Sequence, residues 1–104
     1  MKYFYSDVND PFSDISKEGD LGDILKSFVD LSKENGSFLG LINDNGLILQ
    51  FMCEGEDEFI ADIPKIESNG SFQKNLNFKM CIDLIEDFYN EILIDTNDFR
   101  FVSF

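Results

Sequence analysis

The sequence predicts one α+β domain, residues 1–104, in which an antiparallel sheet of about four to five strands packs against two helices in the order β-α-β-β-β-α-β. Three observations support this prediction. The chain has 104 residues, of which 43% are hydrophobic and 12 are Phe, enough to bury a core without metals or disulfides. Two segments have apolar residues at helical spacing, and an Asn-Gly pair separates two short apolar runs.

The N-terminal segment predicts a strand, a loop and a helix. Residues 2–5 form a short aromatic segment, which indicates an edge strand, and residues 6–19 indicate a loop. Asp20 precedes an apolar stripe at helical spacing, and Asn35-Gly36 is typical of a helix end. A first helix is therefore expected from about residue 21 to residue 34.

The middle of the chain predicts a hairpin and a three-stranded meander. The apolar runs 38–42 and 47–53 flank Asn43-Asp44-Asn45-Gly46, and Asn-Gly favours a type I′ turn because both of its central residues need positive φ. Residues 59–63 then alternate apolar and polar side chains, and Pro64 ends that strand.

The C-terminal part predicts a loop over residues 65–76, a second helix and a last strand over residues 99–104. Asn77 can cap the helix through its side-chain oxygen. The buried stripe expected on this helix consists of Phe78, Cys81, Ile82, Ile85, Phe88, Tyr89 and Ile92.

One face of the predicted sheet is expected to stay uncovered. If Phe59, Ala61 and Ile63 face the helices, alternation places other apolar side chains on the opposite face. These are Ile48, Met52 and Ile60, with Val102 and Phe104 as further members. An open apolar face of this kind would be a dimer or partner surface.

The formal net charge of −13, from 21 acidic and 8 basic residues, restricts the class of partner. Nucleic-acid binders cluster Lys and Arg to neutralise phosphates, whereas these cations are scattered, so direct nucleic-acid binding is not expected. A basic protein is the natural complement. A competing interpretation is that the acids only keep a Phe-rich chain soluble. No signal-peptide pattern or membrane span is evident, which predicts a cytoplasmic protein.

The sequence offers little for catalysis, and we expect neither an enzyme nor a metal or cofactor site. It has no His, the usual acid-base group at neutral pH. Cys53 and Cys81 fall on a predicted strand and a predicted helix, where buried reduced thiols are the ordinary case. The densest acidic cluster, residues 54–58, lacks the ligand spacing of a calcium loop.

Two acidic patches and several aromatic residues are the candidate binding groups. The first patch is the turn with Glu54, Glu56, Asp57 and Glu58, with Asp62 nearby. The second is the outer face of the second helix, with Asp83, Glu86, Asp87 and Glu91, and it continues to Asp95 and Asp98. Candidate aromatic anchors are Phe12, Phe72 and Tyr89, because interface energy concentrates on a few desolvated aromatic groups. The alternative for the two loop residues, Phe12 and Phe72, is that they fold back onto the core.

The layout of residues 37–92 resembles small immunity proteins of bacterial toxin systems, including contact-dependent growth inhibition. The features that it shares are the Asn-Gly hairpin, a strand ending in Ala61-Asp62-Ile63-Pro64, a Gly70-Ser71-Phe72 loop and the helix from Cys81 to Tyr89. The resemblance implies a compact, acidic antitoxin that binds a cognate toxin tightly and blocks its active site or substrate path. It assigns no functional residue.

Together these observations predict a binding protein that neutralises a basic toxin domain, such as a nuclease, as a monomer or weak dimer. Two alternatives remain open at the level of sequence. One is a nucleic-acid-mimicking phage-type inhibitor of a host nuclease, which would use the same acidic chemistry. The other is a non-catalytic homodimeric adaptor built on the open sheet face.

Overall fold

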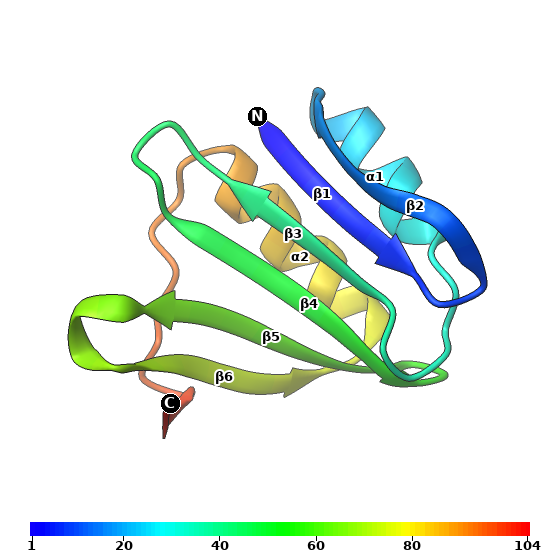
Figure 1. Cartoon of the computed structure of the whole chain (residues 1–104). Helices are drawn as coiled ribbons and strands as arrows, with labels where there is room; N and C mark the ends of the chain where they lie inside the picture. Colours follow the sequence, from blue (N-terminus) through cyan, green and yellow to red (C-terminus); the bar gives the residue numbers. More distant parts are fainter.

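The computed structural model describes the backbone of residues 1–104 and the side chains of residues 1–10 and 16–104. The chain forms one antiparallel sheet in the order β2-β1-β3-β4-β5-β6-β7, with two helices against it (Figure 1). The helices are α1 (Leu21–Asp30) and α2 (Phe78–Tyr89). The strands are β1 (Lys2–Asp7), β2 (Asp10–Glu18), β3 (Phe38–Ile42), β4 (Ile48–Gly55), β5 (Glu58–Lys65), β6 (Gly70–Leu76) and β7 (Arg100–Ser103).

The predicted fold class is confirmed, but the predicted strand number is wrong, because the sheet has seven strands. The two additional strands, β2 and β6, occupy segments that the sequence assigned to loops. In β6, Lys74 lies between Phe72 and Leu76 on the side that faces the helices, so the apolar alternation typical of a half-buried strand is interrupted. Strand β2 pairs with β1 at the sheet edge, where Pro and charged residues are tolerated. Strand β1 is therefore internal and not an edge strand.

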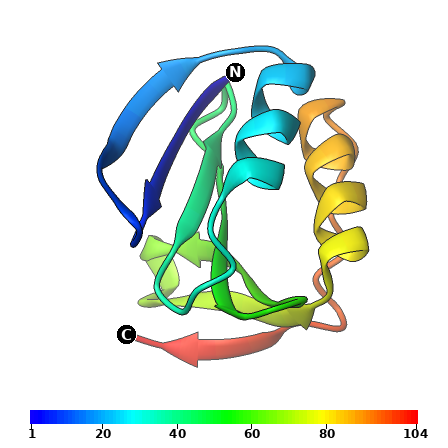
Figure 2. The ribbon, with the colours of Figure 1, turned by 90° about the vertical axis from the view of Figure 1, so that its right-hand side faces the viewer.

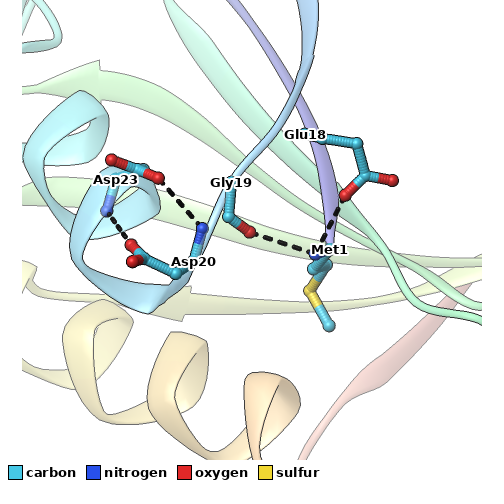
Figure 3. Close-up of polar contacts among 5 residues, drawn as sticks. All are labelled: Met1, Glu18, Gly19, Asp20 and Asp23. Atoms are coloured by element: carbon cyan, nitrogen blue, oxygen red, sulfur yellow. Dashed lines mark hydrogen bonds and ion pairs between the residues drawn. The ribbon is translucent and has the colours of Figure 1, made fainter.

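Helix α1 begins at a reciprocal cap and ends earlier than predicted. Asp20 Oδ1 accepts a hydrogen bond from Asp23 N at 2.9 Å, and Asp23 Oδ2 accepts one from Asp20 N at 3.0 Å (Figure 3). At the other end Leu31 is extended and buried, and Ser32 N donates to the Asp7 carboxylate in β1 at 2.8 Å. This tertiary hydrogen bond turns the chain away before residue 34.

The N-terminus is fastened beside this cap. The Met1 ammonium group donates to the Gly19 carbonyl oxygen at 3.0 Å and lies 3.2 Å from a Glu18 carboxylate oxygen (Figure 3). The start of β1 is therefore held against the end of β2, one residue before the helix cap.

Helix α2 has the predicted cap, since the Asn77 side chain accepts from Met80 N at 2.9 Å. It ends at Tyr89, because Glu91 has a left-handed backbone with φ of 61°. The predicted continuation of the buried stripe to Ile92 is therefore wrong: this side chain is 54% exposed.

The β3–β4 hairpin is confirmed, but the predicted type I′ turn is wrong. Gly46 has φ of 80°, whereas Asn45 does not have a positive φ. Gly46 N donates to Asn43 O at 3.0 Å, and Asn43 Oδ1 accepts from Asn45 N and Leu47 N. The Asn43 side chain thus stabilises a type I geometry, with Gly46 at the left-handed position that follows it.

Both helices lie on the same side of the sheet (Figure 2). Phe28 of α1 is fully buried between them and the sheet, with its ring centroid 5.6 Å from that of Phe51, 5.3 Å from Phe59 and 5.3 Å from Phe78. The largest other fully buried side chains are Ile24, Leu39, Leu41, Leu49 and Ile85. Neither helix has the length and continuous apolar character that a bilayer crossing requires.

Gly40 offers a test of how the uncovered face of the sheet is packed. A Cβ at this position would lie 2.0 Å from Cζ of Phe4, its cross-strand neighbour in β1. We expect Gly40→Ala to lower the free energy of unfolding by about 1–3 kcal/mol, because the Phe4 ring must move. In urea unfolding, the double variant Phe4→Ala/Gly40→Ala should lose less than the sum of the two single variants. Additive losses would contradict this contact.

Candidate partner-binding surface

The acidic turn between β4 and β5 is exposed, but one of its acids has a structural role. Glu54, Glu56, Asp57 and Glu58 all lie at the surface. Asp57 has φ of 55°, and its Oδ1 accepts a hydrogen bond from Phe78 N at 2.8 Å. The carboxylate therefore sits at the N-terminus of α2, where backbone N–H groups and the helix dipole favour negative charge.

The acids of α2 form a second exposed surface, as predicted from their spacing. Asp83, Glu86 and Asp87 are exposed on the helix, and Glu91 follows its end. Lys79 Nζ lies 3.3 Å from an Asp83 carboxylate oxygen, an exposed pair that contributes little stability. Among the described side chains, no cation lies within ion-pairing distance of the other three acids.

The structure places the two patches at opposite ends of one helix. The hydrogen bond from Phe78 N to Asp57 joins the turn to the start of α2, whereas Glu91 follows its last turn. The helix has 12 residues and is therefore about 18 Å long. Asp83 and Asp87 belong with the C-terminal patch, and Glu54, Glu56 and Glu58 are separated from it.

An apolar segment that the sequence interpretation missed lies beside the α2 acids. After the left-handed Glu91, Ile92 is 54% exposed and Leu93 is 94% exposed. The available signal was the run Ile92-Leu93-Ile94, whose three consecutive apolar residues cannot all face the core from a helix. Single exposed apolar residues are common, but Leu93 lines one hollow with the exposed Ile92 and another with the exposed Met80, and adjoining apolar side chains of this kind are typical of an interface.

Leu93 lies between two hollows. The first, which we call the α2 groove, has a volume of about 390 Å³ and lies between α2 and the segment from Leu93 to Phe99. Its apolar lining includes Met80, Leu84, Leu93 and Phe99, and its acids are Asp83, Asp87 and Asp95. The second, which we call the hairpin pocket, has a volume of about 610 Å³ and lies between the β3–β4 turn and the same segment. Its lining includes Leu47, Phe88, Ile92 and Leu93, with Glu91 and Asp95.

Two of the three predicted aromatic anchors, Phe72 and Tyr89, pack inward. Phe72 lies in β6 and not in a loop, half-buried against the core, with its ring centroid 5.4 Å from that of Phe101 in β7. Tyr89 is likewise half-buried against the core. The side chain of Phe12 lies outside the described residues. The structure thus gives Phe72 and Tyr89 packing contacts, and their participation in binding stays a prediction. Glu86 lines neither hollow.

The two cysteines are buried and free. Burial raises the pKa of the Cys81 thiol to about 12, and the negative charge of Asp57 acts in the same direction. The thiol is therefore protonated at neutral pH, which is the opposite of what a nucleophilic cysteine requires. Among the described side chains, no group of acidic or thiol residues converges as a metal site would.

The raised Cys81 pKa predicts a loss of stability in alkaline solution. The unfolded thiol loses its proton near the ordinary value of 9.0, whereas the native thiol keeps it to about pH 12. In this window the native state binds more protons, so the free energy of unfolding should fall as pH rises above 9. Urea unfolding across this range should show a shallower fall for Cys81→Ala. Equal slopes would mean that other groups cause the pH dependence.

Comparisons with known proteins add no information about the role of this surface. No protein-family model matches the chain, and no curated protein or solved structure matches it. The α2 groove and the hairpin pocket are therefore candidate binding sites on the basis of the contacts, volumes and charges given above.

Proposed function

We propose that this chain is a non-catalytic binding protein that neutralises a basic toxin domain by covering its active site or substrate path. The observation that carries the proposal is the exposed Leu93 between two hollows with acidic rims. This arrangement combines an apolar anchor with an excess of acids, three against Lys74 in the α2 groove and two against Lys65 in the hairpin pocket. A protein whose acids served only solubility would have no need of the anchor.

Charge determines which partner fits. A nuclease must present Lys and Arg to its phosphate substrate, so the surface around its active site is positive. The net charge of −13 would attract such a surface at long range. Steered association reaches about 10⁸–10⁹ M⁻¹s⁻¹, against about 10⁵–10⁶ M⁻¹s⁻¹ for neutral partners. Fast capture matters for an inhibitor whose target is destructive while free.

The hollows supply the affinity that charge alone does not. Binding energy concentrates on a few well-packed groups at the centre of an interface, while peripheral charges mainly set rate and specificity. In the α2 groove, a partner's apolar side chain would pack on Met80 and Leu84, and its cations would pair with Asp83, Asp87 and Asp95. Leu93 would be desolvated from both sides.

The absence of catalytic chemistry in the sequence supports a role through binding alone. The chain has no His, both cysteines are buried, and Cys81 is held as a protonated thiol. These features remove the two groups most often used for acid-base and nucleophilic steps at neutral pH. Blocking a partner's active site requires neither.

Coexpression with the product of the adjacent reading frame tests the proposal. We expect the two proteins to copurify as a 1:1 complex, and the toxicity of the partner expressed alone to disappear. Complex formation should be slower at about 1 M than at about 0.1 M salt, as the screening length falls from about 10 Å to about 3 Å. No complex and no protection of growth at either salt would refute the proposal. Capture of a host nuclease in place of the neighbour would favour the phage-type inhibitor.

Two kinds of substitution separate the effect of charge on the association rate from the effect of the apolar anchor on the dissociation rate. Asp87→Lys should reduce the association rate about tenfold or more at low salt, with the difference lost at high salt. Leu93→Ala should mainly raise the dissociation rate, by the roughly tenfold or greater factor expected for a central apolar anchor. Both rates can be measured by surface plasmon resonance with the captured partner.

Glu56→Lys is the matched control for Asp87→Lys. It makes the same change in charge, in the β4–β5 turn at the far end of α2. We expect a smaller effect on association than for Asp87→Lys. Equal effects would indicate that net charge alone steers the partner. A larger effect for Glu56→Lys would indicate that the partner contacts the β4–β5 turn.

A further inference from the structure

The uncovered face of the sheet is a second surface, with a chemistry unlike that of α2. Both helices lie on the other side of the sheet (Figure 2). We call this surface the open face and define it by the cross-strand rows that point away from the helices. Its apolar members are Phe4, Phe38, Ile42, Ile48, Met52, Ile60, Pro64 and Val102. The prediction that Ile48, Met52, Ile60 and Val102 share this face is confirmed.

The open face has a smaller net negative charge than the rest of the molecule. In the described rows of β1 and β3 to β7 its acids are Asp62 and, at the end next to the β4–β5 turn, Glu54 and Glu58. Lys2 and Arg100 lie at the two sides of these rows. In a chain with a net charge of −13, an apolar face whose three acids are nearly balanced by two cations requires an explanation beyond solubility.

The acid at the centre of this face is covered by amides. Asp62 was predicted to lie with the exposed acids of the β4–β5 turn, but it is only 8% exposed, because its carboxylate accepts hydrogen bonds from Gln50 Nε2 at 3.2 Å and Gln73 Nε2 at 2.9 Å. These three residues are direct cross-strand neighbours on β4, β5 and β6. The polar centre is therefore satisfied within the monomer and presents little bare charge to an incoming surface.

We propose that the open face is the dimer interface of this chain, with a second copy packed face to face against it. Charge matching decides in favour of a second copy. A basic partner would find an amide-covered carboxylate at the centre of this face and many exposed acids on α2, whereas a second copy presents the same apolar face, on which acids and cations nearly balance. The result is a β-sandwich in which the two inner faces interdigitate about 10 Å apart.

The size of the face fits this arrangement. The Cα trace measures 33 × 27 × 24 Å, so one side of the molecule offers an area on the order of the 800 Å² that each partner buries in a standard interface. A two-fold axis brings the same patch of both copies together. In each copy the row Phe38, Met52 and Ile60 would lie at the centre. The α2 groove lies on the helical side and stays accessible, so this proposal does not depend on the toxin partner.

Salt dependence distinguishes this interface from the α2 surface. Two copies of charge −13 repel each other, and the repulsion weakens as the screening length falls from about 10 Å at 0.1 M to about 3 Å at 1 M salt. We therefore expect sedimentation velocity of the purified chain to show a dimer that tightens several-fold between these salts. A monomer at both salts up to about 1 mM, or a dimer that loosens with salt, would overturn the proposal.

Substitutions of both charge signs locate the interface. Met52 is 38% exposed in the monomer, so Met52→Glu and Met52→Lys should fold, yet each would bury an unpaired charge in the dimer. We expect both to raise the dimer dissociation constant more than about tenfold. The matched controls are Val29→Glu and Val29→Lys on the exposed side of α1, where Val29 is 55% exposed. These should change the constant less than about threefold.

The Lys variants distinguish a contact at the open face from an effect of net charge alone. If net charge alone governed association, Met52→Lys would strengthen the dimer as Val29→Lys does, and the proposal would fail. Val102→Lys on β7 repeats the test at a second exposed position of the open face, should either Met52 variant fail to fold. Dimers of unchanged affinity in all open-face variants would likewise overturn it.

Discussion

The contact of Phe28 with three other aromatic rings is the interaction on which the rest of the structure depends. It joins α1 to β4 through Phe51, to β5 through Phe59 and to α2 through Phe78. Lys33 Nζ lies 5.8 Å and 5.3 Å from the Phe28 and Phe78 ring centroids and donates to the Leu31 carbonyl oxygen. Because one buried ring holds both helices on the same side of the sheet, the other side is left uncovered, and the acidic face of α2 must point outward.

This one-sided packing separates two kinds of surface. The helical side has the α2 groove and the hairpin pocket, with acidic rims around the exposed Leu93. The sheet side has apolar rows around the amide-covered Asp62. The first surface suits a basic partner and the second suits a copy of itself. Since salt weakens attraction between opposite charges and also weakens repulsion between like charges, the two associations should respond to salt in opposite directions.

The sequence predicted elements well where local chemistry decides them. Asn77 caps α2, and the Asn-Gly hairpin formed, because caps and turns depend on a few neighbouring residues. The sequence did not predict elements whose structure depends on the distant segments with which they pair. Strand β6 has polar side chains on its open side and is a strand because β5 and β7 flank it. The end of α1 is set by a hydrogen bond to Asp7, which is 25 residues from Ser32 in the sequence. Neither feature leaves a periodic signal.

By itself the sequence determined the α+β class, the two capped helices, the burial of Cys53 and Cys81 and the acidic character of the outer face of α2. These follow from composition, periodicity and local capping, which act over a few residues. Only the tertiary structure decided the seven-stranded order, the place of Phe72 in a strand, and the exposure of Leu93. The reason is that burial depends on which segments meet in space: the left-handed turn at Glu91 ends α2 and places the next apolar residues at the surface.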